Sequence, residues 1–198
     1  MSDPLTDADD AASTPLSPDE RAALIPSYVT RRHELNELEQ IGIADADAWA
    51  FARRRGDVLD ADFLRRLHQR MFRHVWTWAG AFSRETNRDI GLDHWQIGPA
   101  LRHLLDDARY WIEHQTYPPD EIAVRLHHRL VLIHPFPNGN GRLSRLAADL
   151  LAAQLGQDRF TWGRGNLVAI ADLRRRYIDA LHAADGEVIE PLIEFARS

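Results

Sequence analysis

Hydrophobic residues recur every three or four positions along most of the chain, which is the spacing of one buried helix face. Polar and charged residues fill the positions between them, as on the outer face of an amphipathic helix. Helices are predicted at about 60–76, 101–112, 122–133 and 143–151, and two more between 167 and 197. The pattern therefore predicts a protein built almost entirely from helices.

The N-terminal region and one internal segment depart from this pattern. Residues 1–18 contain too few bulky apolar side chains to offset the entropy lost on ordering, and we expect a mobile tail. A short helix is expected after Ser17, followed by helices near 28–41 and 45–54. Helical spacing is lost between Gly80 and Pro99, which predicts a short hairpin or an extended flap.

Composition narrows the possible classes of protein. The 198 residues are 44% hydrophobic and 27% charged, which is enough for one folded core without disulfides. The absence of cysteine excludes thiolate nucleophiles and cysteine-ligated metals, and it favours the cytoplasm. The net charge of −6 argues against broad nucleic-acid binding, and no apolar run is long enough to cross a membrane. All 24 basic residues are arginines, so a bound anion must be held by arginine or by backbone groups.

The segment from His134 to Arg145 carries the clearest chemical signal. Gly139 and Gly141 allow successive N–H groups to point into one concavity that leads into a helix N-terminus, an arrangement that suits phosphate. Arg142 and Arg145 lie three residues apart and share a helix face, so both can reach the same anion. His134 stands at the entrance and can accept a proton near neutral pH. A glycine-rich loop alone is equally compatible with a tight connection between helices.

This segment resembles the Fic motif, His-x-Phe-x-Asp/Glu-Gly-Asn-Gly-Arg-x-x-Arg, at every specified position except the fifth, where Asn138 replaces a carboxylate. The resemblance extends over about 58–197 and is closest to the Fic proteins of mobile elements called mobile mystery protein B. It implies an all-α helical bundle with a small β-hairpin flap. It also implies transfer of AMP from ATP, with Mg²⁺, to a Tyr, Ser or Thr hydroxyl of a target protein. On this basis the chain divides into a tail (1–18), a helical arm that is a candidate inhibitory segment (19–57) and a catalytic domain (58–198).

The resemblance also assigns residue roles by position. His134 would be the general base, and Arg142 would stabilise phosphate charge during transfer. Asn138 would be the metal ligand, offering a neutral carbonyl, so that phosphate and water supply most of the other ligands. Phe136 would anchor the loop in the core. The nucleotide-binding residues would be Gly139, Asn140, Gly141, Arg142 and Arg145, with Arg145 on the γ-phosphate. The flap would dock the target backbone through Arg84, Asn87, Ile90 and Gly91.

Many Fic proteins carry an inhibitory helix whose glutamate pairs with the second motif arginine, here Arg145. The predicted helix at 28–41 offers two candidates, Glu39 and Glu34, and neither stands in a complete version of the inhibitory motif. A solvated acidic helix face explains both residues equally well. His127 and His128 lack the spacing of a zinc site, and His127 is a candidate for lining the same pocket.

Two alternatives to adenylyl transfer stay open. A Doc-like toxin would transfer phosphate and would be restrained by an antitoxin partner that supplies the glutamate. A catalytically silent module would bind nucleotide without turnover, which the loss of the carboxylate at Asn138 favours. A homodimer is a further possible assembly.

Overall fold

The computed structural model describes residues 18–52, 56–84, 91–164 and 170–198. These residues form eight helices and no extended strand, and Leu24 and Trp76 make an isolated antiparallel bridge. The helices are α1 (Pro18–Ala23), α2 (Arg32–Ala52), α3 (Ala61–Phe72), α4 (His94–Glu113), α5 (Pro119–Ile133), α6 (Asn140–Gln154), α7 (Ile170–Asp185) and α8 (Glu190–Arg197). The predicted all-α fold is confirmed. Among the described residues, no helix is long and apolar enough to span a membrane.

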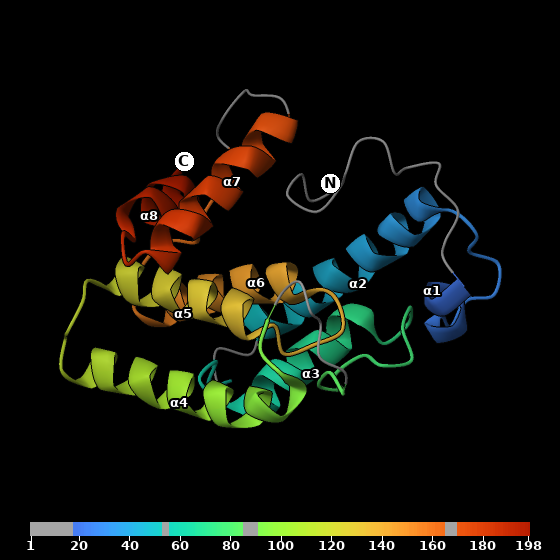
Figure 1. The fold of residues 1–198 in the computed structure, drawn as a ribbon, viewed down its shortest axis with the longest axis horizontal. Helices are drawn as coiled ribbons and strands as arrows, with labels where there is room; N and C mark the ends of the chain where they lie inside the picture. Colours follow the sequence, from blue (N-terminus) through green and yellow to red (C-terminus); the bar gives the residue numbers. More distant parts are fainter. Residues whose placement is uncertain (1–17, 53–55, 85–90, 165–169) are drawn as a thin grey trace.

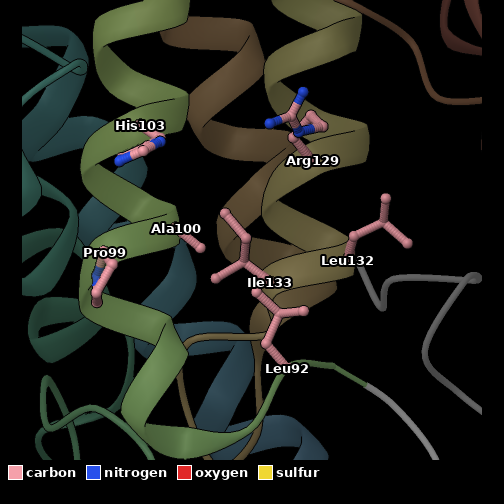
Figure 2. Close-up of a pocket in the computed structure, with 7 residues that line it drawn as sticks. All are labelled: Leu92, Pro99, Ala100, His103, Arg129, Leu132 and Ile133. Atoms are coloured by element: carbon pink, nitrogen blue, oxygen red, sulfur yellow. The ribbon is translucent and has the colours of Figure 1, made fainter.

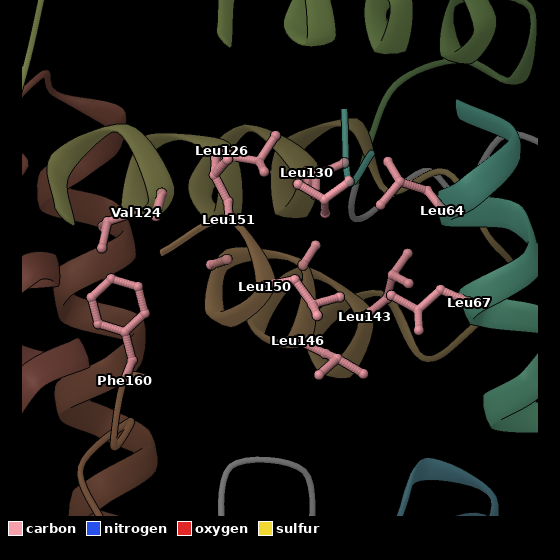
Figure 3. Close-up of a cluster of buried hydrophobic side chains, with 14 of the residues drawn as sticks. Leu64, Leu67, Val124, Leu126, Leu130, Leu143, Leu146, Leu150, Leu151 and Phe160 are labelled. Atoms are coloured by element: carbon pink, nitrogen blue, oxygen red, sulfur yellow. The ribbon is translucent and has the colours of Figure 1, made fainter. Parts of the chain in front are cut away.

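Helices α5 and α6 form the centre of the molecule (Figure 1). A short loop joins them, and their leucines interdigitate along the shared face, where Leu126 and Leu130 lie opposite Leu143 and Leu151 (Figure 3). Helix α4 packs on α5, the α2–α3 pair packs on α6, and α8 packs on α5 while α7 packs on α8. The loop between α5 and α6 therefore lies where the central pair meets α2 and α3.

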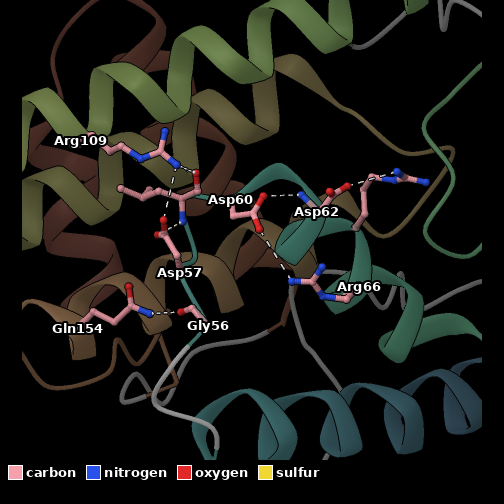
Figure 4. Close-up of polar contacts among 9 residues, drawn as sticks. Gly56, Asp57, Asp60, Asp62, Arg66, Arg109 and Gln154 are labelled. Atoms are coloured by element: carbon pink, nitrogen blue, oxygen red, sulfur yellow. Dashed lines mark hydrogen bonds and ion pairs between the residues drawn. The ribbon is translucent and has the colours of Figure 1, made fainter.

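The start of α3 is held by its own N-cap and by polar contacts from two other helices (Figure 4). Asp60 caps the helix by accepting a hydrogen bond from the Asp62 N–H at 3.0 Å. Arg109 of α4 donates to the Leu59 carbonyl, and Gln154 of α6 donates to the Gly56 carbonyl at 2.7 Å. These contacts fix the direction in which α3 projects its buried side chains toward the α5–α6 loop.

The two helices expected at 28–41 and 45–54 are one continuous helix, α2, so the predicted break was wrong. Gly42 lies inside this helix because α2 crosses α3 closely at that point. A Cβ atom at position 42 would lie 2.2 Å from the Met71 carbonyl oxygen. The glycine thus serves the contact between helices and does not end the helix.

Two other predicted boundaries also shift. The helix expected to reach residue 76 ends at Phe72, because the following segment pairs with the chain after α1: the Ile25 N–H donates to Val75 and the Thr77 N–H to Ala23. Helix α4 begins at His94, seven residues before the predicted start and within the segment expected to be a flap. The described residues that flank the predicted hairpin, 80–84 and 91–93, contain no strand. Residues 1–17 and 85–90 lie outside the described chain, and with them most of the predicted tail and the centre of the flap.

Candidate active site

His134 ends α5 in a conformation that is uncommon for a residue with a side chain. Its backbone lies in the left-handed region, at φ 51° and ψ 58°, and its N–H closes the helix on the Leu130 carbonyl at 3.1 Å. Non-glycine residues held in this region are concentrated at functional sites. The imidazole is partly exposed, and burial lowers its pKa, an effect that the Val131 carbonyl partly offsets. A lowered pKa keeps the ring neutral at pH 7, as a proton acceptor must be.

The loop after His134 is braced by its own side chains. The Asn140 amide is buried, and it accepts from the Phe136 N–H at 2.9 Å and donates to the Phe136 carbonyl at 2.7 Å. Phe136 is itself buried in the core, as the motif implies. Because both polar atoms of the Asn140 side chain are used within the loop, its amide shapes the anion site and leaves phosphate contacts to other groups.

His68 of α3 is a further residue of the site that the sequence reasoning missed. Its ring stacks on Phe136 with centroids 3.8 Å apart and planes 4° apart. One ring nitrogen, Nδ1, accepts from the Gly80 N–H at 2.9 Å, and the other, Nε2, lies 3.0 Å from the Asn138 carbonyl oxygen. Burial lowers the pKa of His68 to about 3. The available signal was a histidine among the apolar residues of the predicted helix at 60–76.

Helix α6 begins beside this braced loop. Gly139 precedes it at φ 78°, and a Cβ atom there would lie 2.5 Å from the Phe72 ring, so the position needs glycine. The first N–H groups of any α-helix have no acceptor within the helix, and in α6 these belong to Asn140, Gly141 and Arg142. They give this end of α6 the partial positive charge that favours anions.

Arg142 is paired with a carboxylate from α2. Its Nη1 atom donates to Glu39 Oε2 at 2.6 Å, and the two side chains are only 9% and 5% exposed. Trp76 Nε1 donates to the other oxygen of Glu39, also at 2.6 Å, and the Arg142 guanidinium lies 4.9 Å from the centre of the Phe72 ring. The carboxylate is thus held by two donors in a buried setting. The expected pairing of Glu39 with Arg145 is wrong, because the step along α6 from Arg142 to Arg145 turns the second arginine toward another set of helices.

Arg145 lies on the side of α6 that faces α5 and α7. Its guanidinium lies 5.8 Å from the centre of the Tyr177 ring, and a Cβ atom on Gly141 would lie 3.7 Å from its Nη1 atom, so it stays close to the loop. His127 is next to this group: its Nε2 lies 3.2 Å from the Tyr177 hydroxyl. Burial, and then the charge of Arg145, lower the pKa of His127 well below its usual value.

Glu34, the other candidate for inhibition, caps the N-terminus of α2. Its carboxylate accepts from the Thr30 N–H at 2.8 Å and from the Arg31 N–H at 3.0 Å, and these bonds lower its pKa. The side chain is partly exposed in the first turn of the helix, where a negative charge is favourable. Of the two glutamates, Glu39 is therefore the one that reaches a motif arginine.

Asn138 is exposed, and its side-chain oxygen already accepts from the Gly139 N–H at 2.6 Å. A neutral amide oxygen engaged with the backbone is a weak ligand for a hard cation such as Mg²⁺. Within the described residues, no group of three or more His, Cys, Asp or Glu side chains is placed to hold a metal ion. The described side chains thus do not build a metal site of their own.

Both ends of the predicted flap are attached to the motif loop. The Ser83 N–H donates to the Pro135 carbonyl at 2.9 Å, and the Leu92 N–H approaches the Ile133 carbonyl at 3.4 Å. Gly91, at φ 94°, lies directly against His134, since a Cβ atom there would be 2.5 Å from the His134 Cβ. Arg84 is exposed at the other end, whereas Asn87 and Ile90 lie outside the described residues.

A largely apolar pocket of about 390 Å³ lies between α4 and α5, behind the end of the flap segment (Figure 2). Leu92 and Ile133 form the part of its wall closest to His134, and Arg129 and His103 stand at the far end (Figure 2). None of the motif residues from His134 to Arg145 lines this pocket, so it is separate from the anion site.

Known proteins resemble this chain over a region that includes the motif loop. The sequence model of the Fic/DOC family matches residues 58–152. The protein adenylyltransferase Fic of Aedes aegypti is 28% identical over 145 residues, which are 71% of this chain and 28% of that protein. The chain thus spans little more than a quarter of the length of this relative.

Solved structures match over most of the chain. The N-terminal Fic domain of a VirB-translocated Bep effector protein from Bartonella quintana superposes with a TM-score of 0.66 at 20% identity, covering 93% of this chain and 87% of that one. A structure of such a Bartonella quintana domain with bound ADP gives a TM-score of 0.63 at 20% identity, with 86% of each chain covered. At this level of identity the match establishes the fold.

Proposed function

We propose that this chain, whose residues 58–152 match the Fic/DOC family, is a protein adenylyltransferase that moves AMP from ATP to a Tyr, Ser or Thr hydroxyl of a target protein. The observation that supports this most strongly is the position of His134. A neutral histidine stands at one end of a braced loop whose other end is a helix N-terminus with two arginines. The adenylyltransferase name of the Aedes aegypti relative supports the same reaction.

The proposed reaction assigns one task to each group. His134 takes the proton of the target hydroxyl as the hydroxyl oxygen forms a bond to the α-phosphorus of ATP. The bond from that phosphorus to the oxygen leading to the β-phosphate breaks, and pyrophosphate leaves. The N–H groups of Asn140 and Gly141 hold the phosphates, joined by that of Gly139 once it leaves the Asn138 side-chain oxygen. Arg142 and Arg145 stabilise the charge that moves onto the leaving group. The proton on His134 then passes to solvent.

Magnesium enters the proposal as an ion that arrives with the nucleotide. Phosphate oxygens and water would supply most of its ligands, and the Asn138 side-chain oxygen would be the contribution of the protein. The tasks of His134 and of the arginines do not depend on it.

The flap segment is proposed to align the target. Its described ends are hydrogen-bonded to the backbone on either side of His134, so a target strand paired with Arg84, Asn87, Ile90 and Gly91 would pass over the base. Backbone pairing fixes where the modified residue sits and leaves its identity to the neighbouring side chains.

Glu39 is proposed to restrain the enzyme. A phosphate that uses Arg142 has to replace the Glu39 carboxylate, which already makes a buried, charge-assisted bond to that arginine. Because this glutamate belongs to the same chain, inhibition would need no antitoxin. The role proposed for Glu39 therefore favours adenylyl transfer under internal control over the toxin alternative.

The test is incubation of the protein with ATP labelled on the α- or on the γ-phosphate. Transfer of the α-label to protein is expected, whereas transfer of the γ-label alone would indicate a phosphotransferase, and bound but unreacted nucleotide a silent module. His134→Ala should lower α-label transfer by about 10²-fold to 10⁴-fold, the usual contribution of a general base. The matched control is His114→Ala, at an exposed histidine that ends α4. Equal activity of the two variants would exclude His134 as the base.

A further inference from the structure

The buried imidazole of His68 connects two segments that the proposed reaction must hold in register. Its Nδ1 atom accepts from the N–H of Gly80, and its Nε2 atom lies 3.0 Å from the carbonyl oxygen of Asn138. Since an N–H has to be donated to Nδ1 and a carbonyl can only accept, the ring is the neutral form with its proton on Nε2. The low pKa of about 3 agrees with this single protonation state.

Both hydrogen-bond partners of His68, the Gly80 N–H and the Asn138 carbonyl, belong to peptides next to a glycine with positive φ. The carbonyl of Asn138 belongs to the peptide that leads into Gly139, the left-handed residue directly before α6. Gly80, at φ 80°, is where the chain turns into the predicted flap, and a Cβ atom there would lie 2.8 Å from the Gln69 Cβ. A hydrogen bond at each point fixes the peptide plane next to a glycine, where the backbone is otherwise least restricted.

The His68 ring also fixes the distance between the loop and α3. The two rings of His68 and Phe136 stack nearly parallel with their centroids 3.8 Å apart, and this contact holds the loop against α3. Phe136 is in turn bonded through both its N–H and its carbonyl to Asn140, the first residue of α6. One side chain of α3 thus positions the loop at two places and the root of the flap at a third.

We propose that His68 is a positioning residue that fixes the anion loop and the flap root relative to each other, through a neutral imidazole that serves both at once. This inference rests on the proposed function, because its consequence is that bound nucleotide and docked target meet at His134 in a fixed geometry. His68 does not touch the reacting atoms. A positioning residue of this kind acts by keeping donors where they are needed before the substrates bind.

The two ring nitrogens can be tested separately, because two other side chains each reproduce one of them. Glutamine places an N–H near the position of Nε2, so His68→Gln keeps a donor for Asn138 and loses the acceptor for Gly80. Asparagine places an oxygen near the position of Nδ1, so His68→Asn keeps the acceptor for Gly80 and loses the donor. His68→Phe keeps the stacking on Phe136 and loses both bonds.

The experiment measures, in the full chain, amide hydrogen exchange of Gly80 and of the non-proline residues of 134–140, and the Kd of α,β-methylene-ATP. His68→Gln should release the Gly80 amide and leave nucleotide affinity near the wild-type value. His68→Asn should protect Gly80 and weaken nucleotide binding by about fivefold, the usual effect of one net hydrogen bond. His68→Phe should show both losses. Nitrogen-15 spectra of the wild-type imidazole should report the tautomer protonated on Nε2.

Three results would overturn the proposal: the other tautomer, retention of affinity and protection in His68→Phe, or parallel loss of both readouts in all three variants. The last would mean that His68 serves general stability alone. If the wild-type chain binds no nucleotide, the proposed function fails, and the exchange of residues 134–140, which needs no nucleotide, still decides the role of His68.

Discussion

The two motif arginines lie three residues apart on α6 and occupy different electrostatic surroundings. Arg142 faces α2 and α3 and is neutralised by the Glu39 carboxylate, itself fixed by Trp76. Arg145 faces α5 and α7, where it lies over the Tyr177 ring and raises the cost of a proton on His127. The comparison teaches that an anion that uses Arg142 must first displace the Glu39 carboxylate, whereas burial, together with the charge of Arg145, keeps the neighbouring His127 neutral.

Loss of the buried carboxylate should have the largest effect on stability. Glu39→Ala leaves the Arg142 guanidinium buried without Glu39, and such a break costs about 3 kcal/mol of unfolding free energy. Glu34→Ala, the matched change at a partly exposed capping glutamate of the same helix, should cost clearly less. Denaturant unfolding of the two variants measures the difference. Equal losses would mean that the Glu39–Arg142 pair is no stronger than a surface contact.

A substitution at the same position should also release the proposed restraint on transfer. Glu39→Gly is expected to raise auto-modification with α-labelled ATP by about tenfold, the effect of removing a competing interaction worth about 1.4 kcal/mol. Glu34→Gly supplies the control and should leave the rate unchanged, since Glu34 lies at the start of α2. Activation by Glu34→Gly with none by Glu39→Gly would transfer the inhibitory role to Glu34.

The lowered pKa of His127, beside Arg145, should appear in the pH dependence of stability. Because burial and Arg145 lower the pKa of His127 in the folded state, the unfolded chain takes up a proton below about pH 6.5 that the folded chain does not. Stability should therefore fall as the pH drops from 6.5, by about 1.4 kcal/mol per pH unit from this group. His127→Gln, which keeps a hydrogen-bonding group near Tyr177, should reduce that slope. An unchanged slope would show that His127 is protonated in the folded protein.

The smallest expected effect concerns the position where the motif departs from its family. Asn138→Asp adds a negative charge to the loop before α6 and should raise the affinity for Mg²⁺ in the presence of ATP, by about threefold because phosphate and water supply most ligands. Titration of transfer activity with Mg²⁺ measures this. Unchanged magnesium dependence would remove Asn138 from the list of metal ligands.

Much of this protein is encoded locally and was predictable from the sequence. The spacing of apolar residues predicts the helical fold, because a helix repeats its faces every 3.6 residues whatever it packs against. The contiguous segment from His134 to Arg145 likewise carries its own backbone chemistry in its glycines and in the residues that follow them. For this reason the loop and its arginines could be proposed before the fold was known.

What the tertiary structure alone decided are pairings between residues far apart in the chain. The sequence alone does not distinguish Glu39 from Glu34 as the inhibitory glutamate. The crossing of α2 over α3 buries Glu39 against Arg142 and leaves Glu34 as a helix cap. The continuity of α2 through Gly42 depends on the same crossing, which needs a residue without a side chain at that point. His68 gains its role from partners 12 and 70 residues away. Such contacts depend on how helices pack, and a periodic pattern states only which face is buried.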